Sequence, residues 1–199
     1  FEMKEGELLE IQTGVSYTSI ANARNNLMVE SKNQTFDQVR KSAHDLWNEM
    51  LGRIQVEDND SINKVKFYTG LYHALLGRGV SSDVNGAYPL VDGKIGQIPL
   101  DKNGVPTHKH YNTDGMWGGF WNLSQLWALV YPEHFSDYIQ SNLDYYDHRG
   151  WLHDGEATGV YTNGVQTNVQ GLLIASAYHC GIRDFDVQKG YQAALKNEI

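Results

Sequence analysis

Two short segments concentrate the residue types that bind sugars or move protons. The segment 108–127 reads HKHYNTDGMWGGFWNLSQLW and holds Asp114 and Trp117 beside two consecutive glycines, where a helix is predicted to start. An indole face can pack on the C–H groups of a pyranose, and a carboxylate can accept hydrogen bonds from ring hydroxyls. The segment could therefore form a sugar subsite. It could equally supply a helix N-cap and core tryptophans that pack through the glycines.

The second segment, residues 150–170, reads GWLHDGEATGVYTNGVQTNVQ. It places Asp154 and Glu156 in a loop broken by glycines, just before a predicted helix. Carboxylates in such a loop could bind hydroxyls or act as a general acid or base. They could equally be solvated loop charges.

His108 and His110 stand two residues apart, a spacing that can ligate a metal ion. No third ligand follows at a reliable spacing. We therefore expect both to be solvent-exposed loop histidines, and we assign no metal ligand in this sequence.

The elements that must position these residues are mostly helical. Thr35 and Gln38 form a capping box, and apolar residues then recur at helical spacing as far as Gly52. The pattern continues in about six helices, which lie near residues 35–52, 60–77, 115–131, 132–147, 164–180 and 184–199. Two long irregular loops, 78–112 and 148–163, separate them. Helical hairpins with long loops at one end are typical of part of an α/α barrel.

Residues 8–17 are the exception, because their apolar side chains alternate as in a β-strand. One strand cannot satisfy its own backbone hydrogen bonds. Since no second strand pattern lies nearby, we expect its sheet to lie upstream of this sequence.

Composition limits the classes of partner. The 199 residues include 16 Lys and Arg against 24 Asp and Glu, a formal net charge of −8. This charge argues against nucleic acid as the main partner. No apolar run approaches the roughly 20 residues of a membrane span. The single cysteine, Cys180, rules out an internal disulfide.

Five segments occur in an order and spacing that resemble glycoside hydrolase family 92, the calcium-dependent exo-acting α-mannosidases. They are TGVSYTSIANARNNL (13–27), AHDLWNEMLGRIQVE (43–57), KFYTGLYHALLGRGVSSDVNGAY (66–88), WLHDGEATG (151–159) and AYHCGIRDFDVQKGYQAALK (177–196). The resemblance covers most of the chain. One departure is Gly118, which follows Trp117 where the family usually has an aspartate.

The resemblance implies a mainly α fold: the first part of an (α/α)6 barrel, preceded by a β-strand remnant of a β-sandwich domain. Residues 1–28 would be the C-terminal part of that sandwich. Residues 29–57 would be a helical linker, and residues 58–199 the first half of the glycosidase barrel.

The resemblance also implies the activity. The chain would be a fragment of a glycosidase that removes terminal α-linked mannose from glycans by an inverting, metal-assisted mechanism. Its catalytic acid, its catalytic base and its calcium ligands would lie outside this fragment, in an enzyme that is extracellular or periplasmic. The candidate substrate-binding residues here are then Asp114, Trp117, Asp154 and Glu156. The alternatives are another (α/α)6-barrel glycosidase of the α-glucoside or trehalose type, and a non-catalytic carbohydrate-binding helical domain.

Overall fold

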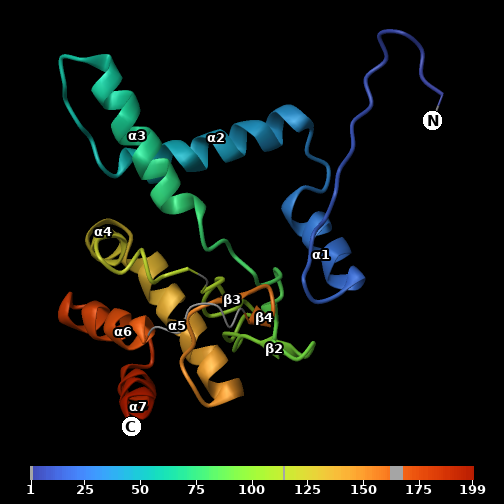
Figure 1. Cartoon of the computed structure of the whole chain (residues 1–199). Coiled ribbons are helices and arrows are strands. Elements are labelled where there is room, and N and C mark those ends of the chain that lie inside the picture. Colours follow the sequence, from blue (N-terminus) through green and yellow to red (C-terminus); the bar gives the residue numbers. More distant parts are fainter. Residues whose placement is uncertain (1, 114, 162–167) are drawn as a thin grey trace.

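The computed structural model describes residues 2–113, 115–161 and 168–199 (Figure 1). Within these ranges the fold has seven helices and two short antiparallel hairpins, as predicted for a mainly α protein. The helices are α1 (Ile20–Glu30), α2 (Phe36–Gly52), α3 (Ser61–Leu76), α4 (Leu123–Val130), α5 (Pro132–Arg149), α6 (Val169–His179) and α7 (Val187–Glu198). The strands are β1 (Ala87–Pro89), β2 (Ile95–Gln97), β3 (Glu156–Ala157) and β4 (Val160–Tyr161).

The core is built around α5. Phe135, Tyr138, Ile139 and Leu143 are fully buried on this helix, and α4, α6 and α7 pack against it (Figure 1). Burying a side chain of this size contributes roughly 1.5–3 kcal/mol. The consecutive helices α4 and α5 pack together, as do α6 and α7, and such helical hairpins are the unit that an α/α barrel repeats.

The helices begin where the sequence provides caps. Thr35 accepts a hydrogen bond from the backbone N–H of Gln38, and Gln38 accepts one from the N–H of Thr35, which confirms the capping box. Pro132 stands in the first turn of α5, as predicted, and Gly150 ends that helix with a φ of 77°. Such a left-handed residue is the usual termination for an α-helix.

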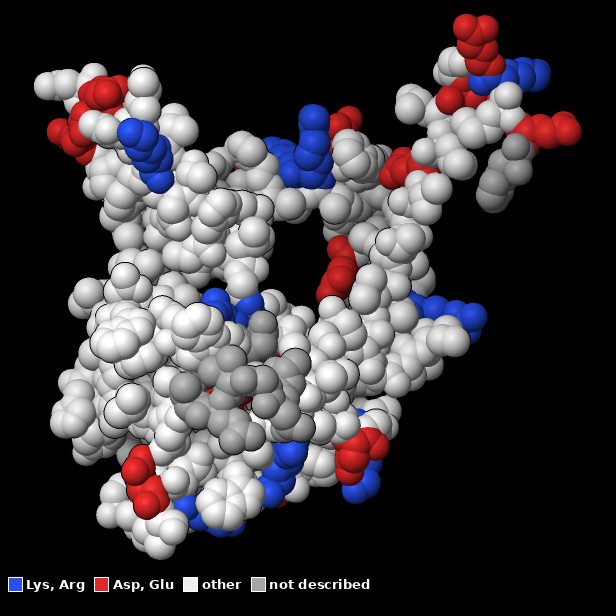
Figure 2. Space-filling view, in the orientation of Figure 1, with Lys and Arg blue, Asp and Glu red and all other residues white. Residues whose placement is uncertain are grey.

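The α2–α3 hairpin projects from the core. Its two helices cross and touch, with the ring centres of Trp47 and Tyr72 4.6 Å apart (Figure 1). Figure 2 shows an opening bounded by α1, α2 and α3, so this hairpin meets the rest of the chain near its ends. The hydroxyl of Tyr131 anchors it by donating to the carbonyl of Met50 at 3.0 Å.

The predicted strand at residues 8–17 is not formed. Residues 7–16 have no regular secondary structure, and no strand within the described ranges lies beside them to supply backbone partners. The helix α1 follows instead, with Ser19 as its N-cap. The assignment of residues 1–28 to a β-sandwich stays a prediction.

Two helix boundaries also differ from the predictions. The helix expected at 115–131 begins only at Leu123, because two glycines, Gly118 and Gly119, lower helix propensity by about 1 kcal/mol each. Residues 115–122 form turns instead. The helix expected at 164–180 is described from Val169 onward, and residues 162–167 lie outside the described ranges.

Both long loops contain a small hairpin that the sequence analysis did not predict. The strands β1 and β2 pair within residues 78–112, and β3 and β4 pair within residues 148–163. The hairpins touch at Gly159, where a Cβ would lie 2.8 Å from the carbonyl oxygen of Leu90. Only glycine allows this approach at its φ of 76°. The two loops are thereby joined over one side of α5.

None of the described helices combines the length and the apolar character that crossing a membrane requires.

Candidate functional site

The two segments singled out in the sequence meet at one turn, which we call the Trp117 turn and define as Thr113, Gly115, Met116 and Trp117. The backbone N–H of Met116 donates to Asp154 Oδ1 at 3.1 Å. One step earlier, the N–H of Thr113 donates to the carbonyl oxygen of Glu156 at 2.9 Å. Residues about 40 positions apart therefore build one site. Asp114, the fourth candidate residue, lies outside the described residues.

Trp117 is open to solvent, with 55% of its surface exposed. It follows the fully buried Met116, whose carbonyl accepts hydrogen bonds from the N–H groups of Gly119 and Phe120. A Cβ added at the next residue, Gly118, would meet nothing within 4 Å, so the space at that position is open too. The turn thus presents an aromatic face that a ligand can reach.

Arg78 supports this turn from the end of α3. Its Nη2 donates to the carbonyl of Gly115 at 2.5 Å, and its own backbone has a φ of 55°. Arg78 is not among the site residues predicted from the sequence. The available signal was its position between Gly77 and Gly79, where a helix ends and the chain must turn.

Asp154 and Glu156 are buried rather than exposed to a ligand, at 5% and 0% of their surface. Glu156 Oε1 pairs with Arg149 Nη1 at 3.0 Å, and the Arg149 guanidinium lies over the ring of Tyr161. Burial raises the pKa of Glu156 to about 7, although the nearby Arg149 acts to lower it. Both carboxylates hold the loop in place here, and their predicted role in sugar binding stays a prediction.

The interior behind the turn is polar. Three buried atoms there, Thr113 Oγ1, Glu156 Oε2 and Gln170 Oε1, have no hydrogen-bond partner in the part of the chain that the structure describes. Gln170 is held by its Nε2, which donates to the Tyr138 hydroxyl at 3.3 Å. The described residues therefore offer an exposed indole on a hydrogen-bonded frame. This arrangement can bind a sugar face, and it contains no exposed pair of acid and base at Asp154 and Glu156.

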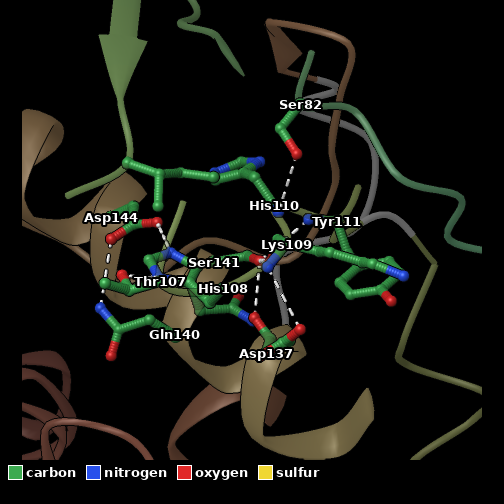
Figure 3. A network of polar contacts seen from close by, with 12 residues as sticks. Ser82, Thr107, His108, Lys109, His110, Tyr111, Asp137, Gln140, Ser141 and Asp144 are labelled. Carbon is green, nitrogen blue, oxygen red and sulfur yellow. Dashed lines mark hydrogen bonds and ion pairs between the residues drawn. The ribbon is translucent and has the colours of Figure 1, made fainter. Parts of the chain in front are cut away.

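The expectation that His108 and His110 are exposed is wrong. His108 Nε2 pairs with Asp144 Oδ2 at 2.8 Å, and both side chains are about nine-tenths buried (Figure 3). His110 is fully buried and stacks on Tyr88, with ring centres 4.0 Å apart. Burial lowers the pKa of His110 to about 3, so this histidine is neutral at physiological pH.

The two histidine side chains do not converge on one site among the described residues. The side chains of His108 and His110 have separate partners, because α5 supplies Asp144 to the first and the loop before β1 supplies Ser81 to the second. Throughout the described ranges, no three His, Cys, Asp or Glu side chains gather in a way that could hold a metal ion.

Comparison with known proteins identifies the family. The family model described as the glycosyl hydrolase family 92 catalytic domain matches residues 22–199, which is most of the chain. The chain therefore belongs to glycosyl hydrolase family 92, as the sequence resemblance predicted. No curated protein is similar enough to match it.

Solved structures agree with this assignment. A family GH92 α-mannosidase from Bacteroides thetaiotaomicron, in complex with mannoimidazole, matches 89% of this chain with a TM-score of 0.79 and 25% identity. A family GH92 inverting mannosidase from the same organism matches 89% with a TM-score of 0.78 and 24% identity, which supports the fold. The chain spans only 22% and 23% of these two proteins.

Proposed function

We propose that this chain is part of a glycoside hydrolase that removes terminal α-linked mannose from glycans. The observation that carries the proposal is the family match over residues 22–199. The similar structure from B. thetaiotaomicron is described as an α-mannosidase, which supports mannose as the sugar. The exposed indole of Trp117 is a suitable platform for one face of that sugar.

An inverting mechanism is part of the proposal. Inverting glycosidases need one carboxylic acid and one carboxylate about 6.5–9.5 Å apart, with room for a water molecule. Asp154 and Glu156 are both buried with protein partners, so neither is free to serve as it stands. We therefore assign no catalytic acid or base in this chain. In the proposed enzyme both come from the remainder of the protein.

Calcium is the metal that the family resemblance implies. Calcium takes six to eight oxygen ligands. The described residues do not fit it, because they contain no cluster of three suitable side chains. We propose that any calcium ligands lie elsewhere in the enzyme.

Uncovered apolar surface supports the idea that this chain is one part of a larger barrel. A groove of about 440 Å³ runs between α6 and α7 and is lined mainly by apolar side chains, among them Ile174, Phe185 and Tyr191. Leu129 on α4 and Leu172 on α6 are also exposed. We propose that the remaining helices of the enzyme cover these faces.

The decisive experiment offers the full-length protein a panel of terminal α-mannosides and α-glucosides. We expect hydrolysis of α-mannosides, and NMR of the first product should show the inverted anomer. A preference for α-glucosides would instead indicate a different α/α-barrel glycosidase. Sugar binding without hydrolysis, with or without added calcium, would indicate a carbohydrate-binding domain.

The role of Trp117 can be tested in the same assay. Replacing Trp117 by Ala removes a contact worth roughly 1.5 kcal/mol, so KM should rise about tenfold. Trp151→Ala is the matched control, since its indole is also exposed but lies beside Lys196 at 4.7 Å. Equal effects of the two substitutions would show that Trp117 has no special role in binding.

We also propose that the enzyme acts outside the cytoplasm, in the periplasm or the medium, where free glycan termini occur. The family resemblance supports this location. Fractionation of the native cells tests it, and recovery of the protein in the cytoplasmic fraction would refute it.

A further inference from the structure

Asp83 connects two parts of the chain that are distant in sequence. Its Oδ2 accepts hydrogen bonds from the hydroxyls of Ser16, at 3.0 Å, and Thr18. Its Oδ1 accepts from Asn26 Nδ2 at 2.7 Å. Asp83 is only 5% exposed, and no ion pair to it occurs among the described residues. A buried carboxylate needs such donors, so its position depends on the N-terminal segment, which we define as residues 13–26.

The N-terminal segment also holds the two residues that follow Asp83, which are Val84 and Asn85. The buried Asn26 accepts from the backbone N–H of Val84 at 3.1 Å, and its amide nitrogen also donates to the carbonyl of Val15 at 2.8 Å. Asn22 accepts from Asn85 Nδ2 at 3.0 Å. The contacts of this segment with Asp83, Val84 and Asn85 each join residues 57 or more positions apart. This is a specific polar interface and not a chance surface contact.

The same loop then pairs with the strand-like stretch that leads to the Trp117 turn. The backbone N–H of Ser81 donates to the carbonyl of His110 at 2.7 Å, and the N–H of Asn112 donates to the carbonyl of Gly79 at 3.1 Å. The N–H of His110 donates to Ser82 Oγ at 3.1 Å, as Figure 3 shows. These bonds fix residues 110–112 against residues 79–82.

We propose that Asp83 is a positioning residue, which couples the N-terminal segment to the Trp117 turn through residues 79–82 and 110–113. Hydrogen bonds and the chain between them form a continuous path. The N-terminal segment holds Asp83, residues 79–82 just before Asp83 hold residues 110–112, and Thr113 directly follows as the first residue of the turn. Loss of the Asp83 contacts frees residues 79–82, and the turn that presents Trp117 loses its fixed orientation. The inference rests on the proposed function only for its kinetic readout.

The test compares three variants of the full-length enzyme with the native protein. Asp83→Ala removes every contact of the carboxylate, while Asp83→Asn keeps its size and one acceptor. Asp101→Ala is the matched control. Asp101 is another hydrogen-bonded carboxylate of the same long loop, but its donors include the backbone N–H groups of Asn103 and Val105, and among the described residues it has no hydrogen bond with the N-terminal segment. Hydrogen exchange is followed by mass spectrometry for peptides covering residues 13–26 and 108–113.

For Asp83→Ala we expect exchange to accelerate at least tenfold in both peptides, and KM for an α-mannoside to rise at least fivefold with a smaller change in kcat. Asp83→Asn should show smaller increases in the exchange rates and in KM. Asp101→Ala should change neither the exchange rates nor KM. Faster exchange confined to residues 13–26, with KM unchanged, would overturn the proposal, because Asp83 would then only anchor the N-terminal segment.

A fourth variant tests the coupling without changing Asp83, in case the Asp83→Ala protein does not fold. Ser16→Ala combined with Thr18→Val removes two donors from the N-terminal side and leaves Asp83 and its loop intact. Coupling requires faster exchange at residues 108–113 in this variant too, and unchanged exchange there would refute it. If the native enzyme hydrolyses no α-mannoside, the proposed function fails, while the exchange experiment still decides on the coupling.

Discussion

The pH dependence of stability should change when Glu156 is replaced by Gln. This side chain is 0% exposed, and burial raises its pKa from the ordinary 4.5 to about 7. Between these values the folded protein keeps a proton that the unfolded chain has released. Folding therefore becomes less favourable as pH rises through this window. At 1.36 kcal/mol for each pKa unit, the loss amounts to roughly 3 kcal/mol.

In the Glu156→Gln variant, the new amide keeps the size and the hydrogen-bonding capacity of the neutral acid and does not titrate. At pH 4 the variant should be about as stable as the native protein, and at pH 8 it should be more stable. If the cooperative unit that unfolds has 150–250 residues, 3 kcal/mol corresponds to roughly 6–12 °C in Tm, and a larger unit gives a smaller shift. All other titrating groups are common to both proteins, so the difference in Tm at each pH isolates Glu156.

Thermal unfolding of the two full-length proteins from pH 4 to pH 8 measures this difference. Glu49→Gln on the exposed face of α2 is the control, because it makes the same chemical change at a position where no carboxylate is buried. The reasoning fails if the Tm advantage of Glu156→Gln stays constant or shrinks as pH rises. That result would mean that the ion pair with Arg149 outweighs the cost of burying the charge.

Two further predictions concern the fold. Leu143→Ala empties a fully buried position on α5 and should cost roughly 2–5 kcal/mol, seen as a lower Tm, whereas Val105→Ala at an exposed loop position should change Tm little. Thr35→Ala removes the side chain that caps α2 and should cost roughly 1 kcal/mol, measured by thermal unfolding, while Thr35→Ser should keep the cap. An unchanged Tm in Leu143→Ala or Thr35→Ala would contradict the packing or the cap described above.

The sequence was sufficient wherever a local pattern determines the structure. The capping box at Thr35 and the proline at the start of α5 are short-range signals, and both helices begin where these signals predict. The family could be identified as well, because its motifs are spread through the chain in a fixed order. The mainly α fold follows from both sources.

Prediction from the sequence was weaker where the structure of a segment depends on contacts with residues far away in the chain. The alternating residues 8–17 have the pattern of a strand, but no neighbouring strand is present among the described residues to pair with them. His108 and His110 occur in a loop-like sequence, but Asp144 and Tyr88 from other elements bury them. A one-dimensional pattern does not contain these partners.

The candidate site shows the same division. Residue types alone selected Trp117, and the structure places its indole at the surface. They also selected Asp154 and Glu156, whose burial follows from contacts with Met116 and Arg149 that sequence spacing cannot reveal. Arg78 was missed because its importance comes from the carbonyl of Gly115, 37 residues away.

The junction between α4 and α5 has an evolutionary consequence. Tyr131 is both the C-cap residue of α4 and the N-cap residue of α5, which begins at Pro132. A single residue therefore separates the two helices. One inserted residue would rotate α5 by about 100° about its axis and carry its buried stripe toward solvent. Homologous enzymes should therefore accept length variation in the hairpin-bearing loops, while the spacing at this junction remains invariant.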